Sequence, residues 1–339
     1  MKSVSISRHA ASELLEKISG AKIGLLGDAC LDFYWEADMR RSRISLETPK
    51  YPLPVVRERA YPGGAGNVAN CVATIGAREV RLITLIGKDW RSAMLLDLLK
   101  SLGINTDGII LSPSRVTPGY CKVLQKGISD VVYEDPRIDF ENYSSPSASE
   151  EEAVLEALDE VAKQVDVLIV EDQFLYGCVT DRVRARLAEL SSLLPVIVDS
   201  RDRGSQFENV ILKPNELEAA VHLGMSPEPK TIERFEAIAR KISLRMNKPV
   251  IVTLGDAGSL WLDRADGEIV HAHPQKILPP FDIVGAGDAF LSAFACAMAA
   301  GANGGESAAL GNIAASIAIK KIGVTGTASP KEILGAAQP

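Results

Sequence analysis

The sequence has few of the residues that build metal sites and disulfide frameworks. It contains only four histidines and five widely spaced cysteines in 339 residues. They form neither a CxxC pair nor an HExxH motif, which are the spacings typical of redox-active and zinc-binding proteins. We therefore expect reduced thiols and no structural or catalytic zinc.

Excess positive charge and long apolar runs are also missing. Acidic residues outnumber basic ones by 44 to 37, for a net charge of −7, so the broad cationic field that binds nucleic acid or an anionic membrane is absent. The most apolar long stretch, residues 289–300, covers 12 residues and is too short to cross a bilayer as a helix. The first residues lack an apolar signal core. We expect a cytoplasmic protein with neither a nucleic-acid nor a membrane partner.

The rest of the composition is that of a folded globular chain. Hydrophobic residues make up 46% and charged residues 24%, which excludes a mainly disordered protein. The length alone is compatible with one large α/β unit or with two smaller ones.

Short apolar runs alternate with amphipathic stretches along the chain. The apolar runs, read as buried strands, are 23–26, 80–86, 167–170, 196–198, 210–212 and 250–254. The amphipathic stretches, read as helices, are 92–102, 151–163, 231–246 and 305–319. Continuous Val/Ile/Leu strands alternating with helices predict a doubly wound, mainly parallel sheet with helices on both faces.

Two segments break this rhythm, at about residues 40–62 and 112–136. The first is rich in proline and the second contains short alternating stretches such as 120–124. Both suit a small β-sheet lid inserted in a single domain that spans residues 1–339. Long surface loops are an equally good interpretation of the pattern alone.

Residues 282–288, Asp-Ile-Val-Gly-Ala-Gly-Asp, lead into a clear helix. Small residues at Gly285, Ala286 and Gly287 leave bare N–H groups at the positive end of the helix dipole, which favours a phosphate or a transferring phosphoryl group. Asp288 at this position could cap the helix, or it could take a proton from an attacking hydroxyl. The residues alone favour the cap.

A second glycine cluster, Gly63-Gly64-Ala65-Gly66-Asn67, opens another predicted helix. No buried strand precedes it, so a dinucleotide-binding fingerprint, and with it an oxidoreductase, is only weakly supported. No GxxxxGK[ST] sequence occurs, which excludes a P-loop. Close backbone approach to a hydroxylated ligand, with Asn67 as donor and acceptor, fits better.

Polar residues also follow several predicted strands. Asp28 and Asp32 follow the first strand, where open α/β sheets bind ligands, and solvent-facing turn acids are the alternative. In the segment 213–218, a carboxylate could hold Mg²⁺ through water, although Asn215 as a helix cap is the better interpretation. The glycine turn at 253–258 suits a loop next to a nucleotide.

Together these motifs resemble the ribokinase-like (PfkB) family of sugar kinases, from about residue 23 to residue 330. The resemblance rests mainly on the clusters at 63–69 and 282–288. It implies ATP and Mg²⁺ as cofactors, Asp288 as the catalytic base, and an anion hole at residues 285–287. The sugar-binding positions that it implies are Asp28, Asp32, Gly63, Gly64 and Asn67. The nucleotide and Mg²⁺ positions are Lys213, Asn215, Glu218, Thr253, Gly255, Gly258 and Asn312. Many members also bind K⁺, for which Asp282 and Val284 are the matching positions, and many use the lid as a homodimer contact.

Within this family the segments 27–35 and 42–49 look most like heptose-7-phosphate kinases, which phosphorylate the anomeric hydroxyl. Arg43 would then contact the phosphate already on the substrate, because arginine pairs with phosphate bidentately. Where those kinases carry a lysine in a DY(A/G)KG segment, this chain has none, and Arg201 or Arg203 would compensate. Ribose, fructose or a nucleoside as acceptor, or a non-catalytic regulator on the same fold, are the alternatives.

Overall fold

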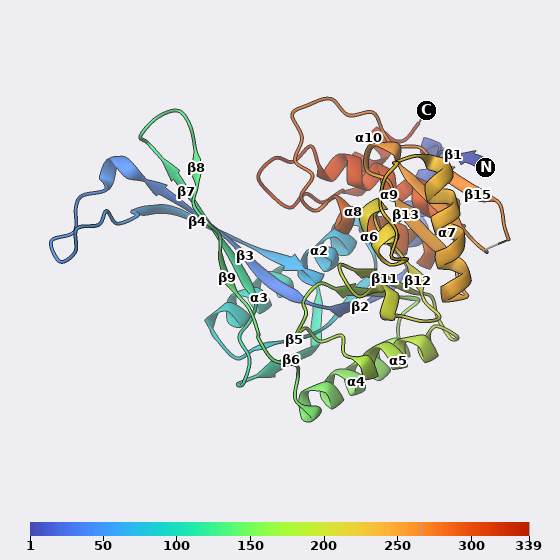
Figure 1. Ribbon diagram of the computed structural model, residues 1–339, viewed down its shortest axis with the longest axis horizontal. Coiled ribbons are helices and arrows are strands. Elements are labelled where there is room, and N and C mark those ends of the chain that lie inside the picture. Colours follow the sequence, from blue (N-terminus) through green and yellow to red (C-terminus); the bar gives the residue numbers. More distant parts are fainter. Residues whose placement is uncertain (265, 339) are drawn as a thin grey trace.

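The computed structural model describes residues 1–264 and 266–338, and in these residues ten strands form one large sheet. Its order is β1-β15-β14-β13-β12-β11-β10-β2-β5-β6 (Figure 1). These strands are β1 Lys2–Val4, β2 Lys22–Gly27, β5 Glu79–Gly87, β6 Asn105–Ser112, β10 Val167–Asp172, β11 Val196–Ser200, β12 Ile211–Leu212, β13 Val250–Thr253, β14 Ser259–Leu262 and β15 Ile269–Ala272. All pairs from β13 to β6 are parallel, and β14 runs antiparallel to both neighbours. The predicted, mainly parallel sheet is confirmed.

Helices cover both faces of this sheet. They are α1 Arg8–Ile18, α2 Ala65–Ile75, α3 Trp90–Ser101, α4 Ala148–Ala162, α5 Asp181–Leu190, α6 Glu216–Val221, α7 Ile232–Met246, α8 Ala286–Ala299, α9 Gly304–Ala318 and α10 Pro330–Ala336. The core on one face comes from α1, α2, α3, α8, α9 and α10, and the core on the other face from α4, α5, α6 and α7. Figure 1 shows α4 and α5 on the side of the sheet opposite α2 and α8. No helix in this described part has the length and apolar character needed to span a bilayer.

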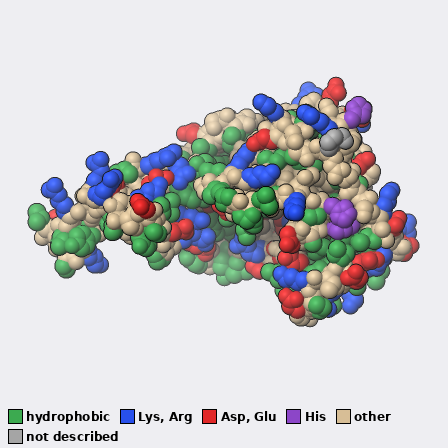
Figure 2. Space-filling model, turned by 90° about the horizontal axis from the view of Figure 1, so that it is seen from above, with side chains coloured by type: hydrophobic (Ala, Val, Ile, Leu, Met, Phe, Trp, Pro, Cys, Tyr) green, Lys and Arg blue, Asp and Glu red, His purple; other side chains and the backbone are tan. Residues whose placement is uncertain are grey.

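A second, smaller sheet forms the lid, which projects from the main body (Figures 1 and 2). Its strands are β3 Ala29–Asp38, β4 Val55–Gly64, β7 Gly119–Lys126, β8 Tyr133–Glu134 and β9 Ile138–Phe140. The pairing is antiparallel except between β3 and β7. Both predicted lid segments therefore contribute strands, while residues 42–54 of the first segment form a loop before β4.

The lid begins earlier in the chain than predicted, because Ala29–Asp38 is its longest strand together with β4. Buried Leu31, Phe33 and Ala37 alternate with the more polar Asp32 and Tyr34. Phe33 packs against Trp90 of α3, with ring centroids 5.4 Å apart. Because side chains alternate along a strand, the face with Phe33 packs the base of the lid on the body. The face with Asp32 and Tyr34 does not take part in this packing.

Candidate functional site

Asp288 and Asn67 bring the two glycine clusters together. Asp288 lies in the first turn of α8, and Asn67 in the first turn of α2. Asn67 Nδ2 donates a hydrogen bond to Asp288 Oδ2 at 2.5 Å across 221 residues of sequence. Burial raises the pKa of Asp288, and the hydrogen bond from Asn67 acts in the opposite direction. The Asp288 carboxylate therefore bonds to a neighbouring helix, which favours its reading as a base over that of a helix cap.

The loop before α8 holds free backbone donors next to Asp288. Gly285 is the N-cap residue and adopts φ 80°, a left-handed conformation that favours glycine. In the described chain, neither the Gly285 nor the Gly287 N–H has an acceptor, whereas the Ala286 N–H donates to the Ile283 carbonyl at 3.2 Å. The predicted anion hole is thus corrected at Ala286, whose N–H closes the turn, and the free donors are those of Gly285 and Gly287.

Asp32 faces Asp288 from the lid. Burial, followed by the negative charge of Asp288, raises the pKa of Asp32 to about 6. Gly63 of β4 passes close beneath it, since a Cβ at Gly63 would lie 2.6 Å from Asp32 Oδ2. The next residue, Gly64, is the N-cap of α2 and has φ 55°. Both glycines therefore support the position of Asp32 and the start of the helix that carries Asn67.

Asp28, predicted to bind the sugar, has a different contact in the structure. Its side chain is 3% exposed. Oδ2 accepts the N–H groups of Gln173 and Phe174 at 2.9 and 2.8 Å, and Oδ1 accepts that of Cys178 at 2.9 Å. Burial raises its pKa to about 6. Asp28 therefore holds the 173–178 loop and also lines the cavity between this loop and the lid, and sugar binding by Asp28 stays a prediction.

Arg43 lies far from this centre. It is exposed in the segment between the short helix Met39–Arg41 and β4, at the outer end of the lid. Strand β3 carries the chain away from Asp32 toward Asp38, which at a rise of about 3.3 Å per residue is roughly 20 Å. The prediction that Arg43 contacts the substrate phosphate in its own chain is therefore wrong.

Lys213 forms a buried ion pair instead of projecting toward a ligand. Its Nζ lies 2.7 Å from Asp199 Oδ2, and its side chain is 3% exposed. Burial by itself would lower the pKa of Lys213, but Asp199 and then Glu218 outweigh it and raise that pKa. The place of Lys213 at the nucleotide stays a prediction, and in the structure its ammonium is paired with Asp199. It serves as a fixed positive charge beneath the carboxylates at the ends of the strands.

The predicted nucleotide positions meet at the ends of β12 and β13. Asn215 and Thr253 form a parallel bridge. Asn215 Oδ1 accepts the Leu217 and Glu218 N–H groups, and Glu218 Oε2 accepts the Asn215 N–H, which completes a capping box. The interpretation of Asn215 as a helix cap is therefore confirmed. Burial, followed by Asp199, raises the pKa of Glu218 to about 7.

The turn that follows β13 is stabilised by glycines in the left-handed region. Gly255 has φ 54° and Gly258 has φ 88°, and the Leu254 N–H donates to the Gly258 carbonyl at 2.8 Å. Asn312 on α9 donates through Nδ2 to the carbonyls of Ala272 and His273 at 2.8 and 3.3 Å. The Asn312 amide therefore positions the end of β15.

Asp282 links two loops near the start of α8. Its Oδ1 accepts the Val284 N–H at 3.1 Å and its Oδ2 accepts the Gly323 N–H at 3.2 Å. Neither oxygen is buried deeply, and Val284 is exposed. These two positions thus form a loop crossing beside the anion hole, which is where the resemblance would put a monovalent ion.

The structure adds residues that the sequence patterns did not single out. Glu171 at the end of β10 is buried, and in the described chain its Oε2 has no partner. A cavity of about 310 Å³ opens between the 173–177 loop and the lid, and its lining includes Tyr120, Asn142 and Arg201. The rule that ligands bind at the carboxyl ends of parallel strands could have pointed to Glu171 and Arg201.

Arg203 and Arg201 play different parts at this cavity. Arg203 forms an ion pair with Asp172 and donates to the carbonyls of Phe174 and Leu175 at 2.6 and 2.7 Å. It therefore holds the 173–177 loop and is not free to act as the compensating cation. Arg201 is exposed and lines the cavity, and its charge lowers the pKa values of Asp288 and Glu218 against the larger effect of burial.

Comparison with known proteins agrees with this geometry. The model of the pfkB family of carbohydrate kinases matches residues 30–332. The bifunctional protein HldE of Geobacter metallireducens is 32% identical over 321 residues, which is 92% of this chain and 62% of that protein. HldE of Trichlorobacter lovleyi is 32% identical over 98% of this chain and 66% of that protein. The chain thus spans a little under two thirds of the length of these relatives.

Solved structures show the same fold. Arabidopsis thaliana ribokinase, complexed with ribose and ATP, superposes with a TM-score of 0.70 at 21% identity, covering 94% of this chain and 98% of the ribokinase. Escherichia coli phosphofructokinase-2, in complex with potassium, gives a TM-score of 0.70 at 21% identity over 93% of this chain and 98% of that one. The predicted ribokinase-like fold is confirmed.

Proposed function

The chain belongs to the pfkB family of carbohydrate kinases, and we propose that it transfers the γ-phosphoryl group of MgATP to a hydroxyl of a sugar phosphate. The observation that carries this proposal is the meeting of Asp288, Asn67 and the free N–H groups of Gly285 and Gly287 at one point. A proton acceptor and anion-stabilising donors side by side are what in-line phosphoryl transfer requires of a protein.

In the proposed reaction each of these residues has one task. Asp288 accepts the proton of the acceptor hydroxyl as the oxygen attacks phosphorus, and the Gly285 and Gly287 N–H groups stabilise the charge on the transferring group. Asn67 orients the base through its hydrogen bond, and its Oδ1 is buried and has no partner in the described chain, so it can accept a sugar hydroxyl. Asp32 holds further hydroxyls from the lid side.

The nucleotide would lie along the ends of β12 and β13. The turn that holds Gly255 and Gly258 directly follows Thr253, which is bridged to Asn215. Glu218 uses only one carboxylate oxygen in its capping box, so the other can hold the Mg²⁺ of MgATP through water. We place a monovalent ion, K⁺, at Asp282 and Val284, by resemblance to the family.

For the acceptor we propose a heptose 7-phosphate-like sugar, phosphorylated at its anomeric hydroxyl. The motifs at 27–35 and 42–49 and the similarity to HldE proteins support this choice. We also propose a homodimer formed through the lid. The exposed apolar side chains of the lid support this, and Figure 2 shows hydrophobic side chains gathered at its far end.

The test is the release of ADP from ATP by the full chain in the presence of a panel of sugars and sugar phosphates. We expect turnover that depends on the acceptor and is greatest with a heptose 7-phosphate. ATP binding without any acceptor-dependent ADP release would instead identify a regulator on the same fold. Turnover with ribose, fructose or a nucleoside alone would retain the kinase and overturn the acceptor.

A further inference from the structure

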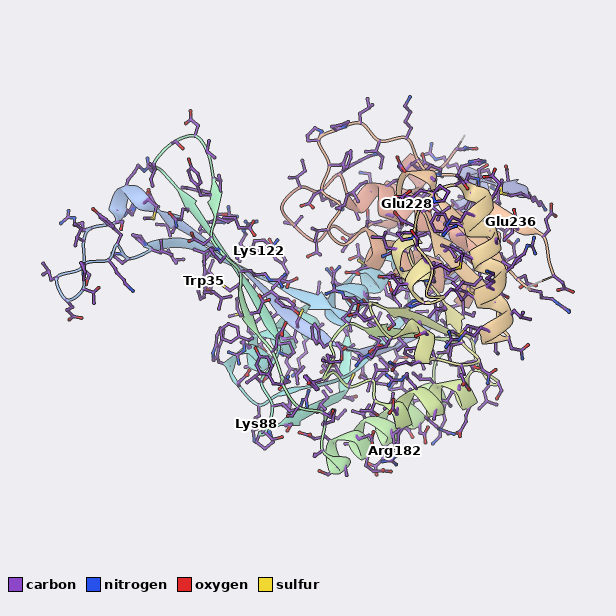
Figure 3. All side chains as sticks on the ribbon, in the orientation of Figure 1. Trp35, Lys88, Lys122, Arg182, Glu228 and Glu236 are labelled. Atoms are coloured by element: carbon purple, nitrogen blue, oxygen red, sulfur yellow. The ribbon has the colours of Figure 1, made fainter. Side chains whose placement is uncertain are left out.

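The face of the lid that looks toward Asp288 carries an ordered set of polar side chains. Across the strands, Asp32 lies between Tyr61 and Tyr120, and the next pair along this face places Tyr34 between Arg59 and Lys122. The alternating residues Phe33 and Trp35 point to the opposite face. Figure 3 labels Lys122 and Trp35 on opposite sides of the lid strands, and Trp35 is on the face that packs against the core.

Most charges on this face are already neutralised within the lid. Arg59 pairs with Glu36 at 3.0 Å, and Lys126 pairs with the same carboxylate at 2.7 Å. Arg137 makes a two-point ion pair with Asp139 and stacks over the Tyr120 ring at 4.2 Å. These cations have anionic partners without any ligand.

Lys122 differs from them. It is half-buried, and within the described residues its ammonium has no hydrogen bond and no ion pair. Its Nζ lies 5.6 Å from the centroid of the Tyr34 ring, and its charge lowers the pKa of Asp32 against the larger effect of burial. A partly desolvated ammonium that has no direct ion pair, and only the more distant charge of Asp32, can bind an anionic group from outside the chain.

The place of Lys122 limits what that anion can be. It lies one pair further along the lid than Asp32 and Tyr120, which at about 3.3 Å per residue is roughly 7 Å. That length matches the span of a sugar between a hydroxyl held by Asp32 and a substituent on its far carbon. The phosphates of ATP have their own donors at the start of α8.

From this geometry we propose that Lys122 binds a phosphate monoester carried by the acceptor at the end away from the reacting hydroxyl. The proposal rests on the sugar kinase activity proposed above and replaces Arg43 as the phosphate contact. If this proposal is right, the acceptor carries a phosphate on its terminal carbon, and the identity of the sugar is left open. One ammonium–phosphate contact of this kind is strong and charge-assisted.

The test compares matched acceptors with the variant Lys122→Met, which removes the charge and keeps the apolar stem. Acceptors are measured in pairs, such as fructose 6-phosphate with fructose and a heptose 7-phosphate with the free heptose. We expect kcat/KM for the phosphorylated member to fall about 10- to 100-fold, mainly through KM, with the unphosphorylated member changed less than about twofold. Lys122→Arg should restore most of the loss.

The control is Lys88→Met, an exposed lysine that Figure 3 shows far from the lid face, and it should leave both members unchanged. Binding of the sugar phosphates without ATP, followed by thermal unfolding, gives a second readout: the midpoint should rise in the wild type and not in Lys122→Met. Equal losses for both members, no loss, or a change of oligomeric state in Lys122→Met would overturn the phosphate site. Absence of any ADP release by the wild type would instead overturn the kinase proposal.

Discussion

At the scale of single residues, the two aspartates after β2 have opposite tasks. Both follow the same strand and both have pKa values raised to about 6, mainly by burial. The Asp28 oxygens accept three backbone N–H groups of the 173–178 loop, while the charge of Asp288 acts on Asp32 and raises its pKa. Their spacing in the sequence predicts that both lie near the ligand, but only the fold decides where each carboxylate points.

The contacts of Asp28 predict a specific loss of stability. In Asp28→Asn one oxygen becomes an NH₂ group, which cannot accept from the loop and meets an N–H instead. We expect the free energy of unfolding, measured by urea denaturation, to fall by about 1–3 kcal/mol. The control Asp202→Asn, an exposed acid on the same cavity, should change it by less than about 0.5 kcal/mol. Equal stabilities of Asp28→Asn and wild type would contradict this role.

The hydrogen bond from Asn67 predicts a change in the pH dependence of activity. Asp288 must be ionised to act as a base, and because burial raises its pKa, kcat/KM should fall on the acid side above the usual carboxyl range. Asn67→Ala removes a donor that favours the ionised form. We therefore expect the acid limb of kcat/KM to move to higher pH by about one unit.

Asn70→Ala provides the matched control for that measurement. Asn70 lies one turn further along α2 and contacts Thr74 rather than the site. Its pH profile should superimpose on that of the wild type. An acid limb in Asn67→Ala that stays in place, or moves to lower pH, would show that Asn67 does not set the protonation of the base.

At the scale of elements, periodicity predicts the body of the protein well and the lid less well. Continuous apolar runs identify β2, β5, β10, β11 and β13 because both faces of these strands are buried. Strand β3 has the alternation of a half-covered strand, in which Leu31, Phe33 and Trp35 face one way. In the sequence, however, its charged residues and its position just after Gly27 are typical of a loop. The distance of Arg43 from the site follows from the same strand, whose direction no local pattern reveals.

The exposed apolar surface of the lid leads us to expect an oligomer. Its exposed apolar side chains include Val55, Val56, Val131, Val132 and Tyr133, a concentration that marks an interaction surface. We expect the wild type to sediment as a dimer and the double variant Val56→Glu, Val131→Glu to sediment as a monomer. Leu193→Glu, on the main body and 80% exposed, should remain dimeric. A monomeric wild type at all accessible concentrations would contradict assembly through the lid.

At the scale of the whole molecule, the proposed function requires an acidic chain to hold phosphate groups through local positive groups. The net charge is −7, yet the site combines free N–H groups at the start of α8, the buried Lys213 and the lid cation Lys122. The motifs at both ends of the chain predict this centre, because Asn67 and Asp288 each follow a glycine cluster. Buried Glu171 and unpaired Lys122 escape prediction, since their significance depends on partners that only the folded chain brings near or withholds.

The measurement that tests the central claim most directly is the turnover of Asp288→Asn with the best acceptor of the wild type. We predict that kcat falls by about 10²- to 10⁴-fold, because the isosteric amide cannot take the proton. The far-UV circular dichroism and the ATP affinity should stay those of the wild type, which separates lost chemistry from lost structure. A variant with intact fold and near-normal turnover would contradict Asp288 as the base, and with it the reading of this site.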